Sequence, residues 1–153
     1  NALAKARFAS AHTGLPALAD DAGMCVDAFG GLPGVDTAHY CLQFGYEKSD
    51  DNNVVALLEQ LQGEDNRRAA MVSTLVAVRS PHDPEPLIAV GRVEGQITRE
   101  RRGSNGFGFD PVMFVPELGR TFAELPNAVK NAYSHRGRSS RQMLELLRER
   151  WLK

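Results

Sequence analysis

The first apolar positions of the chain recur with the period of an amphipathic helix. Five apolar residues cluster near the start, namely Ala2, Leu3, Ala6, Phe8 and Ala9. Gly14 follows them as a helix stop, so we predict a helix over residues 1–13. Because a protein rarely starts within a helix and this chain has no Met at position 1, we also expect that a segment precedes it.

Two short apolar runs, at 15–19 and 24–29, favour β-strands. They flank residues 20–23, Asp-Asp-Ala-Gly, which have the chemistry of a turn. The simplest prediction is a hairpin with the two carboxylates at its bend. The segment 30–34 that follows is rich in glycine and is predicted to be a loop.

The remaining pattern predicts further strands and helices. Residues 71–78 are almost continuously apolar and rich in β-branched side chains, which indicates a central strand buried on both faces. The other predicted elements are a helix at 53–61 capped by Asp50, Asp51 and Asn52, one or two strands over 87–97 interrupted near Gly91 or Gly95, a strand at 112–115, and a helix from Pro126 towards Leu152 bent near Gly137. This order predicts an α/β fold with a mixed sheet, in a single domain over residues 1–153.

Composition and charge narrow the possible partners. Of 153 residues, 42% are hydrophobic and 24% are charged, as in an ordinary soluble globular protein. A net charge of −1 gives no electrostatic reason to bind nucleic acid, and no apolar run approaches the roughly 18 residues that cross a bilayer. We therefore expect no nucleic-acid or membrane partner. Cys25 and Cys41 match no common zinc spacing, so we expect two unpaired cytosolic thiols.

The first cluster that could carry chemistry is the acidic pair Asp20 and Asp21. Adjacent carboxylates between two apolar runs are costly to bury unless a cation compensates their charge. Mg²⁺ prefers oxygen ligands from one or two carboxylates, phosphates and water. A carboxylate at this place could also accept a proton from attacking water. The alternative is a solvated turn, since Asp-Asp is common in turns.

The second cluster is the glycine-rich segment 103–111, Gly-Ser-Asn-Gly-Phe-Gly-Phe-Asp-Pro. Glycines allow backbone N–H groups to approach a ligand closely. Phe107 and Phe109 could stack on a base, and Asp110 could accept a hydrogen bond from it. The alternative is a flexible loop whose aromatic side chains pack inward.

Two further clusters are basic. On one helix, Lys130 and Ser134 share a face with His135 and Arg136 beside it, a patch suited to a polyphosphate or to base oxygens. An ordinary solvated helix face is the alternative. The run 99–102, Arg-Glu-Arg-Arg, could help to hold phosphate, but a solvated turn explains it better and we assign it no role. The other three clusters supply a metal carboxylate, a stacking loop and a cationic helix, the parts needed for metal-assisted attack on a nucleoside triphosphate.

Five segments, taken in order, resemble motifs of the Ham1-like family of ITP/XTP pyrophosphatases. They are NALAKAR at 1–7 (family N-A-x-x-K-A-R), ADDAGM at 19–24 (A-D-D-S-G-L), GGLPGV at 30–35 (G-G-x-P-G-I/V), GFGFDP at 106–111 (G-F-G-Y-D-P), and SHRG at 134–137 (S-H-R-G) with Lys130 at the matching distance before it. The resemblance covers essentially the whole chain. Five motifs in the right order and spacing are highly specific.

The resemblance implies an elongated mixed sheet flanked by helices and a Mg²⁺-dependent nucleoside triphosphate pyrophosphohydrolase. The implied substrates are non-standard purine nucleotides (ITP, dITP and XTP), which would be hydrolysed to monophosphate and pyrophosphate and so removed from the nucleotide pool. It also implies a homodimer, and a cytoplasmic location is expected.

Roles follow from the resemblance residue by residue. Asp21 would be the proton acceptor and a Mg²⁺ ligand, Ala22 would contact the substrate through its backbone, and Lys5 would approach the phosphates. The residues implied in base binding are Phe107, Gly108, Phe109, Asp110, Lys130, His135 and Arg136. Of these, the last three would read the 6-oxo group of the base. An adenine amino group would be badly paired there.

The sequence also departs from the family pattern. Ala22 replaces the usual Ser, Met24 the usual Leu and Phe109 the usual Tyr, and His39 stands where bacterial members commonly have Arg, which puts phosphate affinity or its pH dependence in question. The family's first strand, its S/T-x-N-x-x-K loop and a metal-binding Glu have no counterpart. This agrees with the expected preceding segment, and a chain truly starting at Asn1 is expected to lose most activity.

Two other functions remain open at this point. One is a Maf-like nucleotide pyrophosphatase with a related fold and a different base preference. The other is a non-catalytic nucleotide-binding module. Base preference separates the first from the ITP/XTP pyrophosphatases, and nucleotide binding without pyrophosphate release would identify the second.

Overall fold

The structure, a computed structural model, describes residues 1–152 and is built on a six-stranded sheet in the order β2-β1-β3-β4-β5-β6. The strands are β1 (Ala17–Val26), β2 (Pro33–Gly34), β3 (Arg68–Val78), β4 (Leu87–Ile97), β5 (Met113–Val115) and β6 (Arg120–Thr121). The expected α/β fold, a sheet flanked by helices, is confirmed. The sequence predicts a mixed sheet, with both parallel and antiparallel strand pairs. The pairs β1–β2, β4–β5 and β5–β6 are all antiparallel.

The helices are mostly those that the sequence predicts. The α-helices are α1 (Ala2–Thr13), α2 (Asp50–Gln60), α3 (Asn127–Tyr133) and α4 (His135–Arg150), and the 3-10 segments are η1 (Asp27–Phe29), η2 (Thr37–Phe44), η3 (Asp110–Val112) and η4 (Phe122–Glu124). α1 ends as predicted at Gly14, which is left-handed at φ 68° and donates its N–H to the carbonyl of Ser10. No helix among residues 1–152 is long and apolar enough to cross a bilayer.

The chain folds as two compact units. The first unit contains residues 1–22, 72–92 and 133–152, and the second contains residues 23–71 and 93–132. The three long strands β1, β3 and β4 each contribute residues to both units.

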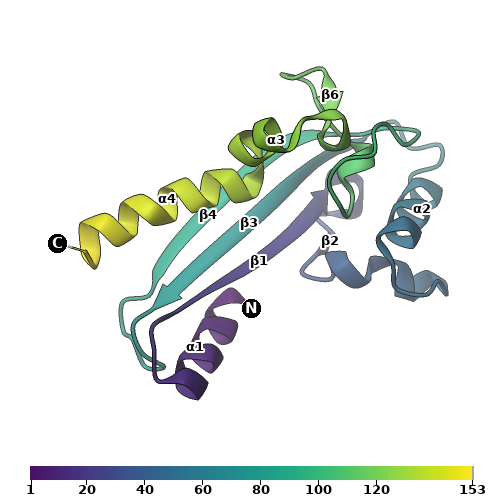
Figure 1. The fold of residues 1–153 in the computed structure, drawn as a ribbon. Helices are drawn as coiled ribbons and strands as arrows, with labels where there is room; N and C mark the ends of the chain where they lie inside the picture. The colour runs from purple at the N-terminus through teal and green to yellow at the C-terminus, as the bar shows by residue number, and fades with distance from the viewer. Residues whose placement is uncertain (153) are drawn as a thin grey trace. The chain divides into compact units, whose positions relative to one another are not determined.

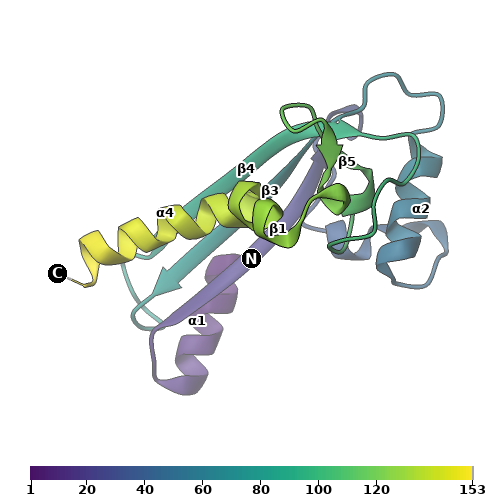
Figure 2. The same ribbon diagram turned by 45° about the horizontal axis from the view of Figure 1, so that its top comes forward.

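In the first unit, helices cover both faces of the sheet. Figures 1 and 2 show α1 and α4 on opposite sides of the strands. The α4 side buries Leu75, Ala77, Leu87, Ala89 and Met143, with Leu146, Leu147 and Trp151 packed against them. The α1 side buries Ala2, Ala6, Val76 and Val78, with Leu3, Ala17 and Ala19 against them. Successive residues of β3 thus face opposite helices, which confirms the predicted central strand buried on both faces.

The second unit has its own core and begins α2 with a serine cap. Its largest fully buried side chains are Met24, Val26, Val54, Leu57, Leu61, Val93, Val112, Met113, Val115 and Phe122. The Oγ of Ser49 accepts the N–H of Asn52 at 2.9 Å and caps α2. The predicted caps Asp50 and Asp51 lie instead in the first turn, where carboxylates interact favourably with the helix dipole.

The predicted hairpin at the acidic pair is wrong. β1 runs without interruption from Ala17 to Val26, through Asp20 and Asp21. The turn preference of Asp-Asp-Ala-Gly is local, whereas the strand is held by its partners in the sheet and by a cation facing each carboxylate. Tertiary contacts therefore override the local preference, and the two carboxylates lie along a strand.

The final helix is also divided differently from the prediction. α3 and α4 are separated at Ser134, whose backbone is extended and whose side chain accepts the N–H of Gly137 at 3.1 Å. The break lies at Ser134 rather than near Gly137 because serine is a strong N-cap. Consequently, Lys130 belongs to α3 and does not share a helix face with Ser134.

β4 continues through both glycines where an interruption was expected. A Cβ at Gly91 would lie 2.0 Å from the carbonyl oxygen of His135 and 2.6 Å from the backbone nitrogen of Ser139. A Cβ at Gly95 would lie 2.2 Å from the carbonyl oxygen of Phe114. Glycine stands at these positions because another backbone passes directly against the strand, not because the strand ends.

We predict that Gly91→Ala destabilises the protein by about 1–3 kcal/mol, because the added methyl group forces the first turn of α4 away from β4. Thermal unfolding followed by circular dichroism measures the change. Val90→Ala is the control, since the Val90 side chain is 52% exposed and its truncation should shift the melting temperature little. Equal melting temperatures for Gly91→Ala and the wild type would contradict this close approach.

Candidate functional site

The two carboxylates of β1 meet different cations. Asp21 shares its side of the strand with Ala17 and Ala19, which pack on α1. Its Oδ1 lies 3.9 Å from the Nζ of Lys5 in α1. The Asp21 side chain is 28% exposed, so a ligand can reach it. Ala22 follows in the strand and is half-buried.

Asp20 faces α4. Its Oδ2 lies 3.2 Å from the Nε of Arg136, the second residue of that helix. Both side chains are about two-fifths exposed, so water screens the pair and its contribution to stability is small. The pair places the guanidinium of Arg136 beside the strand that carries Asp21.

The start of α4 is held firmly against the sheet. Gly91 allows the backbone of His135 to approach β4, as described above. The hydroxyls of Ser73 in β3 and Ser139 in α4 share a buried hydrogen bond of 2.9 Å. His135 itself is buried, at 5% exposure, whereas Arg136 is partly exposed. The imidazole and the guanidinium predicted to act together therefore lie in different environments.

The glycine-rich segment of the second unit is shaped by hydrogen bonds from its own ends. The Oδ2 of Asp110 accepts the N–H of Phe107 at 2.9 Å. At Gly106 the backbone is left-handed at φ 75°, and a Cβ there would lie 2.1 Å from that same oxygen. Asn105 anchors the segment by donating from Nδ2 to the carbonyl of Leu125 at 3.0 Å. These hydrogen bonds define the course of the loop backbone.

A buried ion pair lies beneath this loop. The Nζ of Lys130 donates to the Oδ2 of Asp110, and both residues are under 10% exposed. The same ammonium lies 4.3 Å from the centre of the Phe107 ring, a cation–π contact. Because each charge would be costly to bury alone, the pair fixes the position of Lys130 relative to the loop.

The two phenylalanines of the loop have different surroundings. Phe107 is 57% exposed, so part of its ring is available for stacking. Phe109 is only 4% exposed and packs inward, which is the alternative that the sequence left open for these aromatic side chains. Gly108 between them donates its N–H to the Oδ2 of Asp50 at 2.9 Å.

Sequence reasoning missed the role of α2 in holding this loop. Besides the Asp50–Gly108 bond, the Nη2 of Arg101 lies 2.8 Å from the Oδ1 of Asp51 and donates to its backbone carbonyl at 3.0 Å. The first turn of α2 thus contacts Gly108 within the loop and Arg101 just before it. No local signal could have revealed this, because Asp50 and Gly108 are 58 residues apart.

His39, which stands where bacterial members of the family commonly have Arg, lies in η2 of the second unit. His39 is exposed, whereas Tyr40 is buried against Phe29 and Phe44. Burial raises the pKa of Tyr40 to about 12, so its hydroxyl stays neutral. Thr37 at the start of η2 accepts the N–H of Met24 at 2.9 Å and ties this segment to β1.

The donor set around Asp21 limits how a metal could bind. No group of three or more His, Cys, Asp or Glu side chains gathers anywhere in residues 1–152, so this part of the chain offers no metal cage. Asp20 cannot add a second carboxylate, because it faces α4. Asp21 nevertheless fits the kind of Mg²⁺ site in which one carboxylate, substrate phosphates and water complete the shell.

Comparison with known proteins identifies the family. The model of the Ham1 family matches residues 1–146. This chain belongs to the Ham1 family. A dITP/XTP pyrophosphatase from Verminephrobacter eiseniae is 78% identical over 152 residues, which cover 99% of this chain and 76% of that protein. One from an Acidovorax species is 79% identical over 151 residues, covering 99% and 74%.

Solved Ham1 structures have the same fold. A HAM1 protein from Coxiella burnetii superposes with a TM-score of 0.90 at 43% identity, covering 97% of this chain and 75% of that one. A nucleoside-triphosphatase / dITP/XTP pyrophosphatase from Mycobacterium abscessus gives a TM-score of 0.78 at 42% identity, covering 96% and 74%. The resemblance read from the sequence motifs is therefore confirmed.

The residues that the Ham1 resemblance assigns fall into two groups. Asp21, Ala22, His135 and Arg136 lie in the first unit, and Phe107, Gly108, Phe109, Asp110 and Lys130 lie in the second. Contacts within each unit bring Arg136 to the acidic strand and Lys130 to the glycine loop. The convergence of both groups around one nucleotide stays a prediction, as do the individual roles.

We predict that Asp50→Ala speeds hydrogen exchange of the Gly108 amide several-fold, because that N–H loses its acceptor. Native-state exchange followed by NMR measures the rate. Asp51→Ala is the matched control, since it removes the same charge from the same helix turn and leaves the Gly108 bond in place. Equal exchange rates at Gly108 in the two variants would rule out the contact between α2 and the loop.

Proposed function

We propose that this chain hydrolyses non-standard purine nucleoside triphosphates, namely ITP, dITP and XTP, to the monophosphate and pyrophosphate. One observation carries the proposal: proteins named dITP/XTP pyrophosphatase are 78–79% identical to this chain over 99% of its length. Hydrolysis of these nucleotides would remove them from the pool available for nucleic-acid synthesis.

The proposed chemical step uses Asp21. A water molecule attacks the α-phosphorus, a new P–O bond forms, and the bond from that phosphorus to the bridging oxygen breaks, releasing pyrophosphate. The Asp21 carboxylate accepts the proton of the water. Its partial exposure and its distance of 3.9 Å from Lys5 support this role. The carboxylate lies near a cation but makes no close ion pair with it, so its oxygens remain available to accept a proton.

The proposal includes Mg²⁺ with Asp21 as its protein ligand. The cation, when bound, would neutralise phosphate charge and stabilise the negative charge on the phosphate oxygens and on the leaving pyrophosphate. Lys5, on the same side of β1, would supply a further positive charge near the phosphates. Both roles need only one carboxylate on the α1 side of the strand, as the structure has it.

Base recognition is proposed for Phe107, Lys130, His135 and Arg136. The exposed part of the Phe107 ring can stack on a purine. Lys130 has three N–H donors, of which one is given to Asp110, so others remain for a carbonyl oxygen. Donors directed at the 6-oxo group would leave the amino group of adenine without an acceptor. In this proposal Gly108, Phe109 and Asp110 shape the loop beneath the base, and the backbone of Ala22 contacts the substrate.

The family resemblance adds two features to the proposal: a homodimer and a cytoplasmic location. Sedimentation of the purified protein and microscopy of a tagged chain would test them separately from catalysis.

A substrate panel tests the proposed function. Pyrophosphate release should be at least about 100-fold more efficient in kcat/KM with ITP, dITP and XTP than with ATP, because buried polar groups reject a mismatched partner strongly. Preference for dUTP or methylated nucleotides would instead favour a Maf-like enzyme. Tight ITP binding without pyrophosphate release would identify a non-catalytic module.

We predict that Asp21→Asn lowers kcat for ITP by about 10²–10⁴-fold, because the amide cannot accept the proton and binds Mg²⁺ poorly. Steady-state kinetics and a thermal melt of each variant measure activity and folding. Asp20→Asn is the matched control: it removes the neighbouring carboxylate of the same strand and should reduce kcat much less. A wild-type rate in Asp21→Asn would refute the assignment of Asp21.

A further inference from the structure

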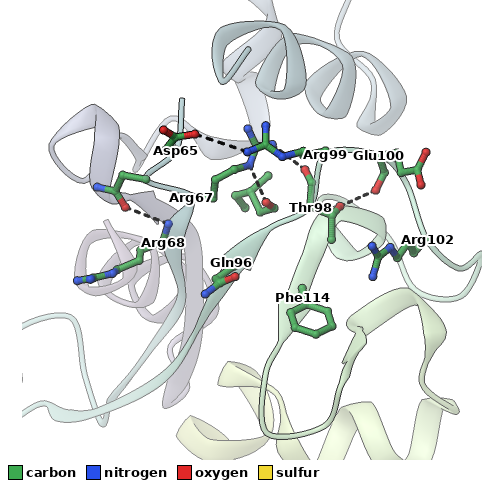
Figure 3. Close-up of a pocket in the computed structure, with 11 residues that line it drawn as sticks. Asp65, Arg67, Arg68, Gln96, Thr98, Arg99, Glu100, Arg102 and Phe114 are labelled. Atoms are coloured by element: carbon green, nitrogen blue, oxygen red, sulfur yellow. Dashed lines mark hydrogen bonds and ion pairs between the residues drawn. The ribbon is translucent and has the colours of Figure 1, made fainter. Parts of the chain in front are cut away.

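A polar cleft in the second unit contains none of the residues assigned to catalysis or base binding. Its volume is about 980 Å³. It lies where the start of β3 meets the end of β4, with β5 beside it (Figure 3). The residues that line it are Asp65, Asn66, Arg67, Arg68, Gln96, Ile97, Thr98, Arg99, Glu100, Arg102 and Phe114. Four arginines stand against two carboxylates, so the lining has a net charge of +2 although the whole chain has −1.

Arg67 is fixed in this cleft by backbone carbonyls. Its Nε donates to Ile97 at 2.9 Å, its Nη1 to Leu61 at 2.9 Å and its Nη2 to Thr98 at 2.7 Å. These carbonyls accept three of its five N–H donors without cancelling its charge. The guanidinium is partly buried and makes no carboxylate ion pair within residues 1–152. A fixed positive charge therefore remains in the lining of the cleft.

The charge of Arg99 acts on Arg67. Burial, the charge of Arg99 and, in the opposite direction, the charge of Glu64 act on its pKa, and their net effect lowers it. The only ion pair of Arg99 among the described residues is with Asp65 at 3.8 Å, and both of these side chains are largely exposed. Such a pair is weak in water. An anion in the cleft would relieve this repulsion, whereas another neutral group would not.

Two more arginines of the cleft have side chains without a protein partner. Within residues 1–152, neither Arg68 nor Arg102 makes a side-chain hydrogen bond or ion pair. The backbone of Arg102 is held firmly, since its N–H donates to Pro111 at 2.8 Å and its carbonyl accepts from Thr121 at 2.7 Å. In Figure 3 the Arg102 guanidinium points into the cleft above Phe114.

We propose that this cleft binds a polyphosphate group, through Arg99 and Arg102 beside the fixed charge of Arg67. Guanidinium groups match phosphate oxygens with paired, charge-assisted hydrogen bonds. The volume is large enough for a di- or triphosphate with surrounding water, and Asp65 and Glu100 disfavour an extended polyanion such as nucleic acid. The polyphosphate could be free pyrophosphate or the tail of a nucleotide. The inference does not depend on the proposed function.

Binding is tested by NMR titration of the ¹⁵N-labelled protein with pyrophosphate, tripolyphosphate and ATP at low salt. The backbone amides of Gln96 and Thr98 report on the cleft, and those of Ala22 and Arg136 report on the candidate catalytic group. We expect saturable shifts at Gln96 and Thr98 that weaken as salt is raised. Equal affinity for pyrophosphate and ATP would assign the site to free polyphosphate, and tighter ATP binding would assign it to a nucleotide tail.

The double variant Arg99→Gln/Arg102→Gln should weaken binding at the Gln96 and Thr98 amides by about tenfold or more, the effect expected when charge-assisted hydrogen bonds are lost. Arg148→Gln/Arg120→Gln is the control, because it removes the same charge from exposed positions outside the cleft. Thermal melts verify that both variants fold. No shift at Gln96 and Thr98 with any of the three anions would overturn the proposal, as would an equal loss of affinity in both variants.

Discussion

The alternation of side chains along the long strands is the constraint on which the rest of the structure depends. In β3, Leu75 and Ala77 contact the α4 side, while Val76 and Val78 contact the α1 side. Both faces must be covered, because apolar residues on both sides of a strand cannot be left in water. The same period in β1 continues from Ala17 and Ala19 to Asp21. A register shift of one residue would exchange the positions of Asp20 and Asp21 relative to the helices.

The glycine loop depends on a different interaction, the buried pair of Lys130 and Asp110. Asp110 accepts from the ammonium and from the N–H of Phe107, so one carboxylate fixes both the cation and the loop backbone. Gly106 leaves the space that this carboxylate occupies. Removing either partner would leave a buried charge uncompensated, which costs more than the pair contributes. The pair thereby positions the exposed Phe107 ring above the ammonium before any ligand arrives.

The sequence predicts those parts of the fold that depend on periodicity and fails where distant contacts decide. α1 and β3 follow directly from their apolar spacing. The acidic segment of β1 has turn chemistry and yet is extended, because the sheet overrides local preference. The two-residue strands β2 and β6 are too short to leave a pattern. In the site, sequence motifs locate the acidic pair and the glycine loop. The sequence pattern does not predict that Phe109 is buried while Phe107 is exposed.

The candidate catalytic residues and the polar cleft differ in the groups that contact their cationic side chains. Lys5, Arg136 and Lys130 each contact a carboxylate. The net charge of each pair is therefore zero before a substrate binds. Phosphate oxygens can replace the two exposed pairs at little cost, because water already screens them. Arg67 instead donates to three backbone carbonyls. They hold its guanidinium in place but do not neutralise its positive charge. A charge that is fixed and uncancelled attracts anions without rearrangement, and this distinguishes the cleft from an ordinary solvated arginine surface.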